Sequence, residues 1–108
     1  MQDLNQVFLT GRLTRDVEIK SLQNNKSVAN ASLAVNRKFG DKEEVVFVDL
    51  ELWDKQAEIL AEYAKKGKKL LIQGRLKQDS WEKDGKKYSK LLLVVEDFQF
   101  LGDNKDSQ

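Results

Sequence analysis

Hydrophobic and polar residues alternate along Val45–Trp53, which predicts a β-strand with two unlike faces. One face is apolar and suits a protein core: Val46, Val48, Leu50 and Leu52. The opposite face is polar but carries two large rings: Phe47, Asp49, Glu51 and Trp53. Trp81 repeats this arrangement, because it falls in phase with Arg75 and Lys77 and out of phase with the apolar positions before it. These rings are therefore expected on a solvent-facing surface.

The same two-residue period predicts four further strands and one short extension. They are Val7–Leu13, the extension Val17–Leu22, Val28–Phe39, Leu70–Gln78 and Lys87–Phe100. After Trp53, apolar residues recur every three or four positions, at Ala57, Leu60, Ala61 and Ala64, which predicts one helix. We expect Asp54 to cap the start of this helix and Gly67 to end it, with Lys65 and Lys66 at its negative end.

Three strands, a helix and two further strands predict an all-β protein with one helix, built as a five-stranded Greek-key barrel with the helix between strands 3 and 4. This architecture is the OB-fold, whose second and third strands and connecting loops bind oligonucleotides or oligosaccharides. The last strand is apolar on both faces, with Leu91, Leu93 and Val95 on one and Leu92, Val94 and Phe98 on the other. A small barrel has only one inside, so we expect one of these faces to lie against another subunit.

The composition predicts one folded domain, because 40% of the 108 residues are hydrophobic and 34% are charged. The chain has no Cys and no His, which excludes disulfides, zinc fingers and the commonest catalytic acid–base residue. Acid pairs such as Glu43 and Glu44 are better explained as solvated charges, so we expect no enzyme, no cofactor and no metal. No apolar run approaches the roughly 20 residues of a membrane span, and no signal pattern is present, so we expect a cytoplasmic protein.

The net charge of +1 hides an uneven distribution. Residues 65–90 contain ten Lys or Arg and three Asp or Glu, whereas residues 43–64 contain one Lys and seven acids. This asymmetry predicts a basic surface on one side of the domain. Rings beside cations on an exposed sheet suit the stacking of unpaired bases and the neutralisation of their phosphates. The alternatives are rings that cover a partner subunit or a helix, or rings that bind a sugar.

Six segments carry motifs in a distinctive order and spacing. They are Val7–Asp16 (VFLTGRLTRD), Ser27–Arg37 (SVANASLAVNR), Leu52–Glu58 (LWDKQAE), Tyr63–Gly67 (YAKKG), Gln73–Leu76 (QGRL) and Asp97–Gly102 (DFQFLG). Together they resemble the bacterial single-stranded DNA-binding protein family over residues 5–102. The resemblance implies an OB-fold homotetramer, a dimer of dimers, that coats single-stranded DNA without sequence preference. It also implies roles in DNA replication, recombination and repair at the bacterial nucleoid, without a cofactor.

The resemblance assigns roles to individual residues. It implies that bases stack on Phe39, Phe47, Trp53 and Trp81, of which Phe39 is added by the resemblance alone. It implies phosphate contacts at Lys55, Lys66 and Lys77, and less directly at Arg12, Arg37 and Arg75. A subunit interface is expected at Phe8, Leu92, Val94 and Gln99, where Gln99 matches a position that the family uses between subunits.

Two departures from the family bear on function. Asp49 and Asp79 stand near the expected rings, where family members commonly carry cations. The family ends in a long tail whose acidic tip recruits replication and repair proteins, and residues 103–108 contain no such tip. We therefore expect a DNA-binding domain at residues 1–102 and the start of a flexible tail at 103–108, with protein partners only if a longer native chain carries the tip. The alternative is a tailless primosome-type protein that binds both single-stranded DNA and replication proteins.

Overall fold

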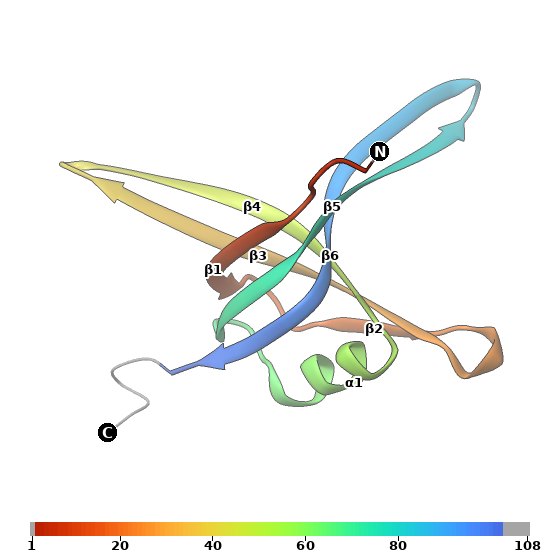
Figure 1. The fold of residues 1–108 in the computed structure, drawn as a ribbon, viewed down its shortest axis with the longest axis horizontal. Coiled ribbons are helices and arrows are strands. Elements are labelled where there is room, and N and C mark those ends of the chain that lie inside the picture. Colours follow the sequence, from red (N-terminus) through yellow and green to blue (C-terminus); the bar gives the residue numbers. More distant parts are fainter. Residues whose placement is uncertain (1, 103–108) are drawn as a thin grey trace.

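The computed structural model describes residues 2–102, which form a closed β-barrel with one α-helix (Figure 1). The elements are β1 (Val7–Leu13), β2 (Glu18–Ser21), the short 3₁₀ helix η1 (Gln23–Asn25), β3 (Ser27–Phe39), β4 (Lys42–Trp53), α1 (Asp54–Tyr63), β5 (Lys69–Lys83) and β6 (Lys86–Leu101). The strand order is β1-β5-β6-β4-β3-β2, and β1 also pairs with β3. This extra pairing closes five strands into the barrel and leaves β2 as an extension on β3. The predicted five-stranded barrel is confirmed. Its helix was predicted between barrel strands 3 and 4, which are β4 and β5 here because β2 is not a barrel strand. The predicted tail at residues 103–108 lies outside the described residues.

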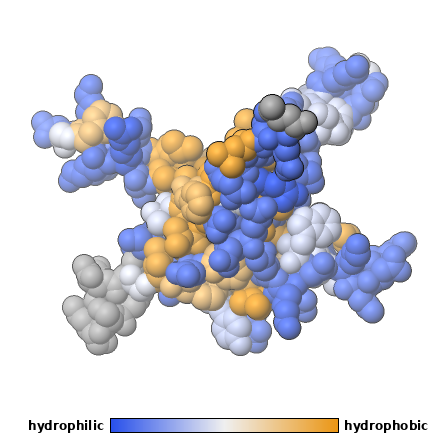
Figure 2. Space-filling view, in the orientation of Figure 1, coloured by the Kyte–Doolittle hydropathy of each residue, from blue (hydrophilic) through white to orange (hydrophobic). Residues whose placement is uncertain are grey.

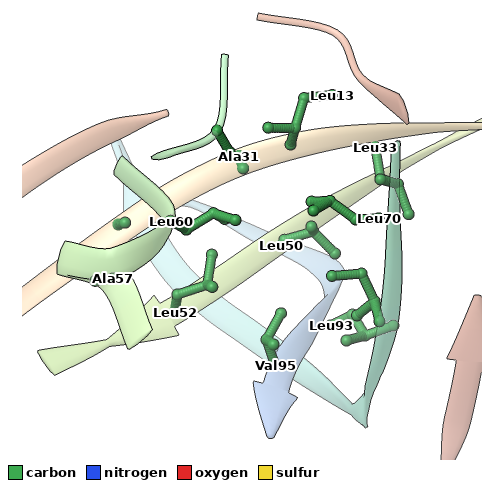
Figure 3. Packing of buried hydrophobic residues seen from close by; sticks show 13 residues of the cluster. Leu13, Ala31, Leu33, Leu50, Leu52, Ala57, Leu60, Leu70, Leu93 and Val95 are labelled. Atoms are coloured by element: carbon green, nitrogen blue, oxygen red, sulfur yellow. The ribbon is translucent and has the colours of Figure 1, made fainter. Parts of the chain in front are cut away.

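The core lies inside the barrel and beneath α1, where the inward-facing residues of the strands meet (Figure 3). Its largest fully buried side chains are Leu13, Leu33, Leu50, Leu52, Leu60, Leu70, Ile72 and Leu93. The helix contributes Ala57 and Leu60 and packs mainly on β3. The small buried side chains of Ala29 and Ala31 on β3 leave room for this contact. The alternating pattern of each strand is thus the physical origin of the core, since only one phase of each strand faces inward.

The ends of α1 differ from the prediction. Trp53 occupies the N-cap position, and no side chain caps the helix there. Asp54 is the first helical residue and has a φ of +51°, and its Oδ1 accepts a hydrogen bond of 3.1 Å from the backbone N–H of Ser27. The predicted capping role of Asp54 is therefore wrong, because its carboxylate ties the helix to the start of β3 instead. At the other end, the helix stops at Tyr63, so Lys65 and Lys66 follow the helix and do not lie in its last turn.

Two hairpins, β3–β4 and β5–β6, extend well beyond the barrel (Figure 1). Val46 was predicted in the core but is exposed, because it pairs with Val35 where β3–β4 leaves the barrel, and Val35 itself is only partly buried against the core. The β5–β6 hairpin is longer than predicted. Asp84 and Gly85 both have positive φ and form a two-residue turn, so the strands pair continuously up to Lys83–Lys86. Figure 2 shows mainly hydrophilic surface on the projecting arms and hydrophobic surface gathered over the barrel.

A β-bulge divides β6 into two parts with opposite phase. Gln73 of β5 pairs with Asp97, but the next residue, Gly74, pairs with Val95, so Glu96 is an extra residue in β6. Phe98 was predicted to share a face with Leu92 and Val94. Because the bulge reverses the phase, Phe98 instead packs against the core on the side of Val95.

Gly74 permits this bulge, since β6 passes directly over its Cα. A Cβ at this position would overlap the carbonyl oxygen of Val94 and the side chain of Leu93. We expect Gly74→Ala to lower the free energy of unfolding by about 1–3 kcal/mol, because the neighbouring backbone has to shift. Urea unfolding at fixed protein concentration measures the loss. Gly102→Ala is the matched control, because a Cβ there meets no atom within 4 Å. Equal stability of the two variants would contradict the close approach.

Candidate nucleic-acid interface

The outward-facing side chains of β4, β6 and β5 form one continuous surface, which we call the ring face. Its members are Phe47, Asp49, Glu51 and Trp53 of β4, Tyr88, Lys90, Leu92 and Val94 of β6, and Arg75, Lys77, Asp79 and Trp81 of β5. Pairing in the sheet joins Glu51 to Val94 and Val94 to Arg75. Two ion pairs also cross the strands: Lys77 Nζ lies 3.3 Å from Glu51 Oε1, and Lys90 Nζ lies 3.7 Å from Asp49 Oδ2. The barrel therefore gathers on one side residues that are far apart in the sequence.

Three of the four predicted stacking rings lie on the ring face and are open to solvent. The exposed fractions are 65% for Phe47, 38% for Trp53 and 45% for Trp81. Each belongs to the polar phase of its strand, as the alternating pattern predicted. Phe47 is paired with Ala34 of β3, which is a small neighbour.

Phe39 lies elsewhere. It is exposed, as the resemblance implied, but its register places it on the opposite side of the β3–β4 hairpin from Phe47. The guanidinium carbon of Arg37 lies 5.4 Å from the centroid of its ring, a cation–π contact. The structure therefore brings Arg37 and Phe39 together at the hairpin end, apart from the ring face.

Tyr88 is a ring that the sequence analysis missed. Its ring stacks on that of Trp81, with centroids 5.8 Å apart and planes inclined by 18°. The two residues are cross-strand partners in β5–β6, and they line an open hollow of about 520 Å³. The signal was present in the Asp84-Gly85 turn, because a two-residue hairpin fixes the register that sets Trp81 opposite Tyr88. One side of the Trp81 ring is thus covered by Tyr88, which leaves the other side for a ligand.

Glu51 is the second residue that the sequence analysis left without a role. Only 8% of its surface is exposed, although it lies on the polar phase of β4. Its Oε1 accepts a hydrogen bond of 2.8 Å from the indole Nε1–H of Trp53 and one of 3.3 Å from Lys77 Nζ. The pattern placed Glu51 in phase with Trp53, but only the pairing of three strands brings Lys77 to the same carboxylate.

Three of the six residues predicted to contact phosphate have a protein partner, and the other three are described by their exposure. Arg75 pairs with Glu96 at 3.5 Å, and Lys77 pairs with Glu51 and with Asp79, the latter at 3.6 Å. Arg12 donates a hydrogen bond of 3.0 Å to the carbonyl oxygen of Gly67. The other three are Arg37, Lys55 and Lys66, all of them exposed. Within residues 2–102, no acidic side chain forms an ion pair with Lys55 or Lys66.

The acids that depart from the family pattern each have a cation beside them. Asp49 lies next to Lys90 and Asp79 next to Lys77. The hydrogen bond to Glu51, followed by the charge of that carboxylate, raises the pKa of the Lys77 ammonium above its ordinary value of 10.5, and Asp79 acts in the same direction. Positive and negative charges therefore alternate closely on the ring face, which limits its net attraction for an anion.

The predicted subunit interface splits into two places. Phe8 and Gln99 are exposed and border a small hollow of about 130 Å³ on the outer side of β1, β5 and β6. Leu92 and Val94 lie on the ring face and are only 6% and 7% exposed within this one chain. They therefore offer little surface to another subunit.

The described residues also bear on metals and membranes. Residues 2–102 contain no group of three or more acids arranged to hold a metal ion. In the same range, no helix is long and apolar enough to cross a membrane.

Comparisons with a family profile and with individual proteins indicate the same family. The profile of the single-strand binding protein family matches residues 4–101. The single-stranded DNA-binding protein of Treponema pallidum is 42% identical over 106 residues, which cover 94% of this chain and 60% of that protein. The one of Wolinella succinogenes is 42% identical over 110 residues, which cover 96% of this chain and 68% of that protein. Single-stranded DNA-binding protein 1 of Synechocystis is 41% identical over 107 residues, with 96% and 88% covered. This chain therefore spans about two thirds or less of the first two relatives.

A solved structure shares the fold. It is described as a Plasmodium falciparum SSB complex with ssDNA, and it matches with a TM-score of 0.85 over 94% of this chain and 98% of that one. The sequence identity is 24%, so this likeness bears on the fold alone. It supports the predicted OB-fold barrel.

The raised pKa of Lys77 provides a test of its ion pair with Glu51. Glu51→Gln removes the charge and weakens the hydrogen bond, so we expect the pKa of Lys77 to fall toward 10.5. Because the pKa is raised in the folded protein, the pair stabilises the fold fully below about pH 10.5 and loses this effect as the pH rises through the raised pKa. NMR titration of the Lys77 side-chain nitrogen measures the shift. Asp79→Asn, which removes the weaker partner, should change it less. An unchanged pKa in Glu51→Gln would contradict the pair.

Proposed function

The chain belongs to the single-strand binding protein family, and we propose that it binds single-stranded DNA without sequence preference. In this proposal, bases stack on the exposed rings and nearby cations neutralise the phosphates. The protein acts by binding and not as an enzyme. It protects single strands during replication, recombination and repair in the bacterial cytoplasm, at the nucleoid.

One observation carries this proposal: the exposed aromatic rings of Phe47, Trp53 and Trp81 all lie on the ring face. A group of exposed apolar rings marks a surface that binds a ligand or a partner. A base of any identity presents a flat π-face, and each stack contributes about 1–3 kcal/mol. Bases in a duplex are already stacked, so this mechanism favours single strands.

Phosphate contacts supply the second part of the proposal. Lys55 and Lys66 are the strongest candidates, because both are exposed and neither forms an ion pair with an acid among residues 2–102. Arg37 and Phe39 would engage DNA at the end of the β3–β4 hairpin. Arg12, Arg75 and Lys77 have protein partners that a phosphate must compete with. Binding then weakens with salt, since each phosphate contact releases counterions.

Titration of Trp fluorescence with oligo-dT tests the proposal directly, at two salt concentrations and with duplex DNA as the control. We expect strong quenching by oligo-dT, weaker binding at the higher salt concentration and little response to duplex. Absence of both quenching and binding would contradict the proposed function.

Substitution of single rings tests the stacking mechanism. We expect Trp53→Ala and Trp81→Ala each to weaken oligo-dT binding by about 5- to 150-fold, which corresponds to the loss of one stack of about 1–3 kcal/mol. Tyr63→Ala is the matched control, because Tyr63 is an exposed ring on α1, outside the ring face. Fluorescence anisotropy of labelled oligo-dT gives the affinities, and circular dichroism confirms that each variant is folded. Unchanged affinity in both Trp variants would eliminate stacking.

We also propose that the protein is a homotetramer, so that several copies of the ring face bind one strand. The exposed Phe8 and Gln99 support a contact between copies on the outer side of β1 and β6. Sedimentation at micromolar concentration should give about four times the chain mass of 12.4 kDa. Phe8→Glu should shift the distribution to smaller species, whereas Ile59→Glu on α1 should not. A monomer for the unmodified chain would rule out this part of the proposal.

A further inference from the structure

We propose that Glu51 is a positioning residue for single-strand binding, which fixes the ring of Trp53 for stacking and holds the Lys77 ammonium away from phosphates. This inference rests on the proposed function. It assigns a role to a carboxylate that a DNA-binding surface would otherwise exclude.

The geometry around Trp53 supports the first part. The indole has a single N–H donor, and its 2.8 Å bond to Glu51 Oε1 uses that donor completely. Glu51 and Trp53 are two residues apart on β4, so both side chains leave the strand on the same side. A bond from a rigid strand position to the ring edge limits rotation of the ring while leaving its flat side open. The ordering that stacking requires is then already present before DNA arrives.

The surroundings of Glu51 indicate that its charge has a specific partner. The residue is 8% exposed and lies beside Val94 in the sheet, a setting in which an apolar side chain would avoid the cost of burying a carboxylate. Lys77 offsets this cost, because its ammonium lies 3.3 Å from the same oxygen that accepts the indole bond. Glu51, Trp53 and Lys77 therefore form one unit, in which Glu51 contacts both of the other side chains.

The consequence for Lys77 is opposite to its predicted role as a phosphate contact. Its ammonium is shared between Glu51 at 3.3 Å and Asp79 at 3.6 Å. A phosphate would have to displace one carboxylate and would still meet the field of the other. Lys77 thus neutralises Glu51 on the ring face, and removing the Glu51 charge leaves only the more distant carboxylate of Asp79 to compete with a phosphate for Lys77.

Two substitutions of Glu51 separate these roles. Glu51→Gln keeps an acceptor for the indole N–H and removes the charge. We expect the Trp53 indole resonance in NMR spectra to stay near its place, and the dependence of log K on log salt for oligo-dT to steepen by about 0.7, the effect of one added phosphate contact on a single strand. Glu51→Leu removes the acceptor. The indole resonance should then shift, and the oligo-dT affinity should be about two- to tenfold lower than that of Glu51→Gln, because both variants lack the charge and only Glu51→Leu lacks the acceptor.

Asp49→Asn is the matched control for charge, because Asp49 is also an acid of the ring face but pairs with Lys90 and has no bond to an indole. It should leave the Trp53 resonance in place. Trp53→Phe keeps a ring and removes the N–H, so adding Glu51→Leu to it should cost no further affinity. Additive losses in the double variant, or an unchanged Trp53 resonance in Glu51→Leu, would overturn the positioning role. An unchanged salt slope in Glu51→Gln would overturn the role assigned to Lys77.

A measurement on the unmodified protein keeps the test valid if Glu51→Leu does not fold. The Trp53 indole N–H should exchange with water more slowly than that of Trp81, which has no hydrogen-bond acceptor among residues 2–102. Equal exchange rates would overturn the proposal. Because exchange is measured without DNA, a protected Trp53 in a protein that fails to bind oligo-dT would show that the proposed function is wrong while the Glu51–Trp53 link stands.

Discussion

Closure of the barrel is the constraint on which the rest of the structure depends. β1 lies between β5 and β3, and its short pairing of Arg12 with Ala34 and Leu13 with Leu33 turns an open sheet into a closed one. Once the sheet is closed, every strand has one phase facing a common interior and the other facing outward. The leucines of the core and the rings of the outer surface are therefore two results of a single geometric condition. β6 can complete the barrel beside β5 only because Gly74 presents no Cβ to its backbone.

A feature of this structure could be predicted from the sequence when it depends on residues that are neighbours in the chain, and not when it depends on residues far apart. Alternation is local, so it correctly placed all the barrel strands and put Phe47, Trp53 and Trp81 on exposed faces. Contacts between distant segments are not local, and most of what the pattern missed depends on them. The partner of Trp81 and the meeting of Lys77 with Glu51 are set by which residues stand opposite each other across strands. The bulge that turns Phe98 inward is likewise a property of two strands together, and Asp54 binds a backbone N–H that lies 27 positions earlier in the chain.

The charges of the ring face define the character of the proposed binding. A surface that attracts nucleic acid by charge alone would be uniformly basic, and this one alternates Asp49 with Lys90 and Asp79 with Lys77. The overall charge of +1 agrees with such a balance. In the proposed binding, aromatic contact is the main source of affinity. Lys55 and Arg37, which form no ion pair with an acid among residues 2–102, lie on the helix and on the β3–β4 hairpin. Stacking also allows discrimination between single and double strands, because a charged surface attracts both and a stacking surface attracts only unpaired bases.

The length of the β5–β6 hairpin has a mechanical consequence. Within the sheet, β6 is supported by β4 only at Leu93 and Val94, so the segment that carries Trp81 and Tyr88 is a ribbon of two strands with no third layer behind it. Such a ribbon bends and twists more easily than a barrel wall. Trp53 is fixed at the start of α1, whereas Trp81 lies on this flexible hairpin. The distance between the two rings therefore changes when the hairpin bends. If bases stack on both rings as proposed, the number of nucleotides between them varies with the bending of this hairpin.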